Sequence, residues 1–233
     1  MKRILNYFSA VELCLWGASV LAISISFFCF EQTGYLSLIG SLIGVSSLIL
    51  CAKGNPLGMA LSVVFSVIYS IISFSFAYYG EMITYLGMTM PMSVLSLVAW
   101  LRHPHKERRA EVEVGEVHGK EYLLLGVLTV GITVGFYFIL KVFGTANLIP
   151  STLSVATSFT AVYLCARRSP YYALCYGAND IVLIVLWVLA SLTDRSYVSV
   201  TVCFILFLIN DLYGFLSWRK MRARQEQNIS VSS

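Results

Sequence analysis

The sequence predicts an all-α integral membrane protein that crosses the bilayer with eight helices. Of its 233 residues, 58% are hydrophobic and only 12% are charged, whereas a soluble domain usually carries about 25% charged residues. The apolar residues gather into eight segments, each near the ~20 residues that a helix needs to cross the hydrocarbon. Short polar breaks, which contain most of the Lys and Arg residues, separate these segments.

The eight segments follow one another along almost the whole chain. Because backbone groups in lipid must be satisfied internally, each segment is expected to be a helix. Pro56 and Pro170 lie near the starts of two segments, where proline is tolerated. No convincing cleavage site follows the first segment, so we expect a retained helix rather than a signal peptide. The expected spans are Val11–Phe30, Gly34–Ala52, Pro56–Tyr79, Met82–Leu101, Tyr122–Phe143, Ile149–Ala166, Tyr171–Leu192 and Tyr197–Trp218.

The placement of basic residues predicts the orientation in the cell membrane. If the chain begins in the cytoplasm and the spans alternate, every Lys and Arg except Lys141 and Arg195 falls on the cytoplasmic side. This matches the positive-inside rule. We therefore expect both termini to be cytoplasmic, with the polar loop Arg102–Lys120, and we expect a disordered tail over Arg222–Ser233. The loop contains an HxH pair, but two imidazoles alone rarely make a site, so no metal is expected.

Two parts of the chain resemble each other. Cys51 and Pro56 precede two spans that close on Trp100, and Cys165 and Pro170 precede two spans that close on Trp218. One span separates the two three-helix units, so both enter the membrane from the same side. This predicts a parallel 3+1+3 repeat of the SWEET type, with an extra N-terminal helix. The expected domains are 1–33 (N-terminal helix), 34–103 (first repeat), 104–148 (connector and linker helix), 149–220 (second repeat) and 221–233 (tail).

Two acidic residues lie inside the last two spans, where a carboxylate is costly. An Asp at the centre of a membrane helix costs about 2.5–3.5 kcal/mol on insertion scales, so such residues usually mark a substrate or ion pathway. Asp180 follows Asn179, and Asp211 follows Asn210. We therefore expect a binding site between the two repeats, near the middle of the membrane.

Helical periodicity groups other side chains with these acids. Rings on the same faces could stack on a flat polar compound, and a carboxylate could pair with a cationic ring or accept hydrogen bonds from ribose hydroxyls. Serine stripes can instead simply let helices approach closely, and terminal Trp residues can be interfacial anchors. At 100° per residue, one face of the seventh span carries Tyr172, Tyr176, Asn179, Asp180 and Trp187; one face of the eighth carries Phe204, Phe207, Asn210 and Asp211; and one face of the third carries Ser62, Ser66, Tyr69, Ser70 and Ser73.

Three stretches of the chain carry a family resemblance. They are Tyr79-Gly80-Glu81 followed by Pro91-Met92 and Trp100; Asp180 with Trp187; and Asn210-Asp211-Leu212-Tyr213-Gly214 through Trp218. These stretches resemble the YG[DE]…PM…W pattern, the second binding helix and the closing N-x-x-Y-G…W of the PnuC family of vitamin transporters. The resemblance covers about Gly34 to Trp218. The chain departs from the family where W-x-x-W-x-x-x-[ND] reads Ala173-x-x-Tyr176-x-x-x-Asp180, without either tryptophan.

The resemblance implies a homotrimeric facilitator that takes up nicotinamide riboside, a precursor of NAD, which intracellular phosphorylation then traps. It also implies the roles of the candidate residues. Asn179 and Asp180 would contact the ribose or the pyridinium ring, and Tyr176 and Trp187 would stack, with Tyr172 as a further candidate for stacking. Asn210, Asp211 and Tyr213 would complete the site. The expected partners are a small-molecule vitamin or nucleoside and membrane lipid, without a nucleic acid or a cofactor.

Other functions stay open at this point. Because both tryptophans of the family motif are missing, the substrate could be thiamine or another vitamin or nucleoside. The topology alone would also fit a sugar facilitator of the SWEET type, since architecture does not fix the substrate. A membrane-embedded enzyme is a weaker alternative, because no nucleophile–base pair or metal cluster stands out. The chain has no P-loop, so it is not expected to be an ATP-driven motor.

Overall fold

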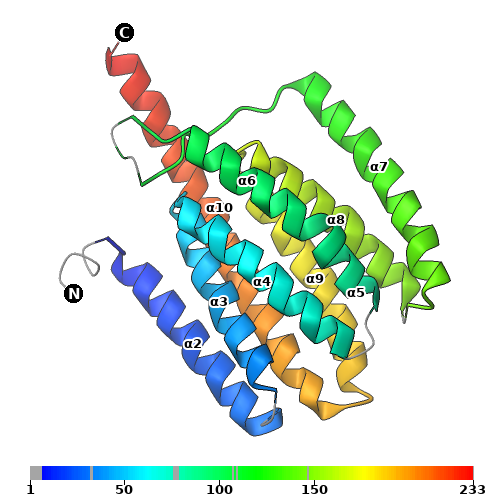
Figure 1. The fold of residues 1–233 in the computed structure, drawn as a ribbon. Helices are drawn as coiled ribbons and strands as arrows, with labels where there is room; N and C mark the ends of the chain where they lie inside the picture. The colour runs from blue at the N-terminus through cyan, green and yellow to red at the C-terminus, as the bar shows by residue number, and fades with distance from the viewer. Residues whose placement is uncertain are drawn as a thin grey trace.

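The computed structural model describes residues 7–31, 34–75, 79–106, 108, 110–145 and 147–232. In this part of the chain, eight helices are long and apolar enough to cross a membrane, which confirms the predicted fold class. Figure 1 shows them as one bundle. The helices are α2 (Ala10–Phe30), α3 (Tyr35–Ala52), α4 (Pro56–Ser75), α5 (Tyr79–Thr84), α6 (Met90–Arg102), α7 (Gly119–Val142), α8 (Leu148–Ala166), α9 (Tyr172–Ser191) and α10 (Val198–Ser232). The π-helical turn η1 (Tyr85–Thr89) joins α5 to α6, so these three elements form one span. The short 3-10 helix η2 (Arg195–Tyr197) precedes α10.

The two three-helix units make corresponding contacts. In the first unit, α4 packs against both α3 and α6, and in the second, α9 packs against both α8 and α10. The units meet where α3 contacts α10 and where α6 contacts α8, two contacts that the predicted repeat relates to each other. The remaining helices lie outside this ring, with α2 against α3 and α10, and α7 against α8 (Figure 1).

The fourth span contains a π-helical turn, η1, that the sequence analysis did not anticipate. Pro91 has no backbone N–H, and its ring crowds the carbonyl four residues earlier. The preceding N–H, that of Met90, bonds instead to the carbonyl of Tyr85, five residues back. The extra residue in this turn places Tyr85 and Thr89 in the interior, where both are buried. Turns of this kind are often found at functional sites.

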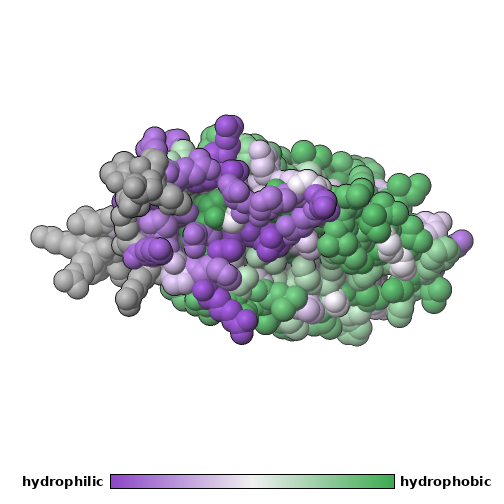
Figure 2. Space-filling model, turned by 90° about the horizontal axis from the view of Figure 1, so that it is seen from above, coloured by the Kyte–Doolittle hydropathy of each residue, from purple (hydrophilic) through white to green (hydrophobic). Residues whose placement is uncertain are grey.

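One end of the molecule carries the start of α2, the end of α10 and the loop between α6 and α7 (Figure 1). In Figure 2, which views the molecule from above, hydrophilic residues gather towards this end and hydrophobic residues cover most of the other half. We call this end the polar end. The arrangement agrees with the expected placement of both termini and the loop on one side of the membrane.

The prediction of a disordered tail is wrong, because α10 continues as a helix to Ser232. Two kinds of contact support this extension. Arg222 pairs with Glu226 one turn later at 2.7 Å, and Gln225 donates a hydrogen bond to the Val112 carbonyl of the α6–α7 loop at 3.1 Å. The composition of the tail could not reveal the second contact, because it comes from a residue more than 100 positions away. Ser233 lies outside the described residues.

Candidate functional site

A small cavity lies inside the bundle, where the two three-helix units meet. Its volume is about 70 Å³, which holds a few water molecules. Side chains from α3, α4, η1, α6, α8, α9 and α10 line it. Every helix of the two predicted repeats therefore contributes to its wall, while α2 and α7 do not.

The polar part of the wall is acidic. Asp180 on α9 and Asp211 on α10 both line the cavity and are only 4% and 5% exposed. Both side chains therefore contribute a carboxyl group to the same small space. No lining residue in the described part of the chain is Lys, Arg or His. Because two like charges repel when both are buried in one cavity, the pair is suited to a bound cation or a shared proton.

Asn179 also lines the cavity, and α8 holds its side chain in place. Its Oδ1 accepts hydrogen bonds from Ser154 at 3.2 Å, Thr157 at 2.9 Å and Ser158 at 3.0 Å. These three hydroxyls direct the amide oxygen towards α8. The NH2 group of Asn179 is therefore the donor that this side chain can offer to a ligand.

Six aromatic rings also line the cavity. Tyr172 and Tyr176 line it from α9, on the face that the sequence predicts. Phe65 and Tyr85 line it from the first unit, with their ring centroids 6.2 Å apart. The sequence analysis did not single out these two rings. The one signal for Tyr85 is Pro91, because the π-helical turn that precedes this proline places Tyr85 inside the bundle.

The first unit supplies hydroxyls as well as rings. Ser62 and Ser66, on the serine face predicted for this span, both line the cavity. The Ser62 hydroxyl lies 2.7 Å from that of Ser47 on α3, and Ser66 donates to the Ser62 carbonyl at 2.9 Å. The two units therefore differ in chemistry, since the carboxyl groups come from the second unit alone.

The structure brings five of the eight sequence-predicted residues together. These five line the cavity: Tyr172, Tyr176, Asn179, Asp180 and Asp211. The other three, Trp187, Asn210 and Tyr213, do not line it.

These three residues have partners in other parts of the bundle. The indole of Trp187 donates to the Tyr69 hydroxyl at 2.8 Å. The amide of Asn210 donates to Ser19 on α2 at 3.1 Å. The Tyr213 hydroxyl lies 3.2 Å from the Glu12 carboxylate, also on α2. Successive helical residues point about 100° apart, so Asn210 and Tyr213 face α2 while Asp211 faces the cavity.

Two aromatic clusters close the cavity. Towards the polar end, Tyr172 packs against Trp100 and Trp218, with ring centroids 6.3 Å and 5.1 Å away. Towards the opposite end, Tyr69 packs against Trp187 and Phe204, with centroids 6.3 Å and 5.7 Å away. Tyr172 and Phe204 also belong to the cavity wall. The cavity is therefore closed at both ends.

The fold defines a multi-pass membrane protein with a cavity between two three-helix units. The chain belongs to the nicotinamide mononucleotide transporter family, whose model matches residues 34–220. This match confirms the resemblance found in the sequence.

Two similar proteins agree with this assignment. A relative from Neisseria mucosa, named nicotinamide riboside transporter PnuC, is 25% identical over 226 residues, covering 94% of this chain and 83% of the relative. A crystal structure of the vitamin B3 transporter PnuC matches with a TM-score of 0.82 at 19% identity, over 94% of each chain. At this identity the second match concerns the fold.

Proposed function

We propose that this chain carries nicotinamide riboside across the cell membrane by facilitated diffusion, and that phosphorylation inside the cell traps the product. The observation that carries this proposal is the pair of carboxyl groups, Asp180 and Asp211, which line one cavity together with aromatic rings. Nicotinamide riboside has a cationic pyridinium ring and a ribose with free hydroxyls. A cationic ring is attracted both to carboxylates and to aromatic faces.

The charge of the cavity favours a nucleoside over a nucleotide. The family name mentions nicotinamide mononucleotide, which adds a phosphate to the same nucleoside. No basic side chain lies among the described lining residues, so a bound phosphate would be buried without a cationic partner. Burying an unpaired charge is strongly unfavourable. The relative from Neisseria mucosa is likewise named for the riboside.

The roles of the individual residues follow from their positions. Asp180 and Asp211 neutralise the pyridinium ring and accept hydrogen bonds from the ribose. Asn179 donates from its NH2 group, and Tyr172 and Tyr176 stack in place of the two tryptophans of the family motif. Trp187, Asn210 and Tyr213 act indirectly, by packing the helices that carry these residues.

The cavity must widen to accept this ligand. Sites for small organic molecules usually occupy about 300–1,000 Å³, whereas this cavity measures about 70 Å³. Because the walls come from both three-helix units, separation of the units would enlarge the cavity and open one end. We therefore propose that this closed form lies between the inward-open and outward-open forms of a transport cycle.

We further propose that the polar end faces the cytoplasm, because nearly all the basic residues of the described part of the chain lie there. We propose a homotrimer on the family resemblance alone. Chemical cross-linking of the purified protein tests the trimer. Cross-linked products no larger than a dimer would contradict it.

A second substrate deserves a direct comparison. Thiamine is also a cationic aromatic compound without a phosphate, and the loss of both tryptophans from the binding motif alters the stacking surface. The acidic cavity therefore suits either compound, whereas it disfavours an anion. An enzymatic function would require product formation from one of these compounds by the purified protein.

Ligand-induced thermal stabilisation of the purified protein tests the proposal. A ligand that binds the folded state raises stability by mass action. We expect nicotinamide riboside to raise the unfolding temperature, with no shift from nicotinamide mononucleotide or the uncharged nucleoside uridine at the same concentration. A larger shift with thiamine would make thiamine the substrate. A shift with the mononucleotide alone would contradict the proposal.

A further inference from the structure

A second, larger cavity lies at the polar end and is separate from the closed cavity described above. Its volume is about 550 Å³. The start of α2, the α3–α4 turn, the α6–α7 loop and α10 supply its walls. Its charged lining residues are Lys53, Arg108, Lys220 and Arg224, with Glu12 and Glu111.

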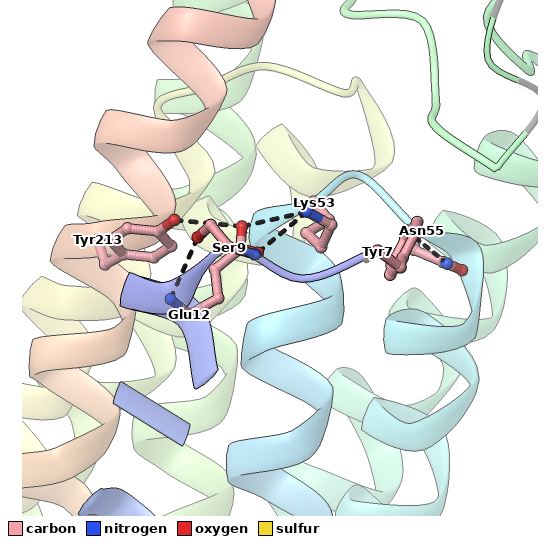
Figure 3. Close-up of polar contacts among 6 residues, drawn as sticks. All are labelled: Tyr7, Ser9, Glu12, Lys53, Asn55 and Tyr213. Atoms are coloured by element: carbon pink, nitrogen blue, oxygen red, sulfur yellow. Dashed lines mark hydrogen bonds and ion pairs between the residues drawn. The ribbon is translucent and has the colours of Figure 1, made fainter. Parts of the chain in front are cut away.

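The charges of this cavity do not cancel. Figure 3 shows that Lys53, Ser9 and Tyr213 converge on the Glu12 carboxylate, with Lys53 Nζ at 3.0 Å. Arg224 forms an ion pair with Glu111 in the same way. Among the described residues, neither Arg108 nor Lys220 has an ion-pair partner. The cavity therefore keeps positive charge that an anionic group can neutralise.

An apolar groove of about 250 Å³ adjoins this cavity, between α2 and α3. Phe8, Leu13, Trp16, Ile49 and Leu50 line it, and Glu12 lines both the groove and the basic cavity. Large apolar side chains of both helices are exposed on the outside of the bundle, among them Leu21 and Ile25 on α2 and Leu36 and Ile39 on α3, where a membrane protein meets the hydrocarbon region. In a bilayer, the apolar molecule available to fill such a groove is an acyl chain.

The side chains at the junction join the two spaces. Tyr7 lines the basic cavity and Phe8 lines the groove, and their ring centroids are 5.0 Å apart. Lys53 Nζ lies over both rings, 4.8 Å and 5.7 Å from their centroids. One molecule with an anionic head and an apolar chain could therefore occupy both spaces at once.

We propose that this composite site binds an anionic phospholipid. Its phosphate lies near Arg108 and Lys220, and one of its acyl chains lies in the groove between α2 and α3. Basic pockets between helices at the membrane surface commonly bind anionic headgroups. The presence of the groove favours a lipid over a soluble phosphate compound, because a soluble phosphate compound would occupy only the basic cavity. A bound lipid would tie the extra N-terminal helix to the transport bundle.

The test measures the affinity of the purified full-length protein for phosphatidylglycerol in detergent, by native mass spectrometry. We expect Lys220→Gln and Arg108→Gln each to weaken binding about fivefold, since one Lys or Arg near the membrane surface contributes about that factor. Arg219→Gln is the matched control, because Arg219 is the neighbour of Lys220 on α10 but packs over Phe215 instead of lining the cavity. Equal loss in Lys220→Gln and Arg219→Gln would overturn the proposal.

Two further probes distinguish the sources of the phosphate and the role of the charge. Phosphatidylcholine with the same acyl chains is expected to bind at least fivefold more weakly than phosphatidylglycerol. Glycerol 3-phosphate, which has the phosphate without the chains, is expected not to compete with phosphatidylglycerol. Equal binding of the two lipids would show that the basic cavity does not distinguish an anionic headgroup, which would contradict the proposal. Effective competition by glycerol 3-phosphate would identify a soluble phosphate as the ligand and overturn the lipid proposal.

Discussion

Trp100 and Trp218 pack against each other with ring centroids 5.3 Å apart, and each is hydrogen-bonded to the opposite three-helix unit. The Trp100 indole donates to the Cys165 carbonyl at 3.0 Å, and the Trp218 indole donates to the Cys51 carbonyl at 2.7 Å. The predicted repeat relates Trp100 to Trp218 and Cys51 to Cys165, so the two bonds are equivalent. Both cysteines line the closed cavity. These two hydrogen bonds between the units therefore clamp the units together on the side of the cavity that faces the polar end.

Loss of one clamp bond is expected to favour opening at the polar end. Trp218→Phe removes a buried hydrogen bond worth about 1 kcal/mol, or roughly a fivefold change in an equilibrium. The buried thiols of Cys51 and Cys165 report this opening through their rate of labelling by a water-soluble maleimide. We expect that rate to rise about fivefold in the variant. Trp16→Phe is the control, because Trp16 also donates one hydrogen bond but lies outside the cavity. Equal rates in Trp218→Phe and wild type would argue against a clamp.

The acidic pair is expected to set the affinity for the cation. Asp180→Asn or Asp211→Asn removes a carboxylate from the cavity wall, and we expect nicotinamide riboside to bind roughly 10- to 100-fold more weakly, or about 1.4–2.8 kcal/mol. Isothermal titration calorimetry measures this change. Asp194→Asn serves as the control, because Asp194 is exposed in the turn before η2, where its side chain accepts a hydrogen bond from the Ser196 N–H far from the cavity. An unchanged affinity in both cavity variants would remove the pair from the binding site.

The ion pair between Lys53 and Glu12 is expected to matter for stability. Glu12 is 4% exposed, and Lys53→Met would leave its carboxylate without a cation. We expect a loss of about 1–3 kcal/mol in the free energy of unfolding. The double variant Glu12→Gln/Lys53→Met removes both charges and is expected to recover much of this loss. Thermal unfolding in detergent measures both effects, and a single variant as stable as wild type would contradict the expectation.

The orientation is expected to place the α6–α7 loop in the cytoplasm. In a background without the native cysteines, Glu116→Cys should resist a membrane-impermeant maleimide in intact cells. Arg195→Cys, at the opposite end of the bundle, should react. The basic residues crowd the end that carries Glu116, which is why this orientation is favoured. Labelling in the reverse pattern would invert the topology.

The composition and the placement of basic residues were sufficient to predict the eight spans, because the bilayer itself imposes the length and the helical form of each span. The cavity was harder to predict. Four of its residues lie on one face of α9, from Tyr172 to Asp180, so helical periodicity alone groups them. Trp187 shares that face, but it lies seven residues beyond Asp180, which is about 10 Å along the axis. A projection down the helix axis shows the direction of each side chain but not its position along the axis.

Non-local contacts explain why two of the predicted residues lie outside the cavity, and a local irregularity explains one residue that was missed. Asn210 and Tyr213 lie beside Asp211 in the sequence, but α2 supplies partners that draw both away from the cavity. Periodicity cannot show which edge of a polar face meets an extra helix. Tyr85 was missed because an ideal helical period does not include a π-helical turn.

Uptake by purified protein in liposomes is the most direct test of the central claim. Asp180 and Asp211 line the same cavity, and Glu81, which is also buried, does not line it. The lining therefore offers no second acidic site through which proton binding would be coupled to transport. We expect labelled nicotinamide riboside to reach equal concentrations inside and outside without any imposed gradient, and more slowly with Asp180→Asn. Accumulation above the external concentration, driven by a pH or sodium gradient and abolished by an ionophore, would contradict facilitated diffusion.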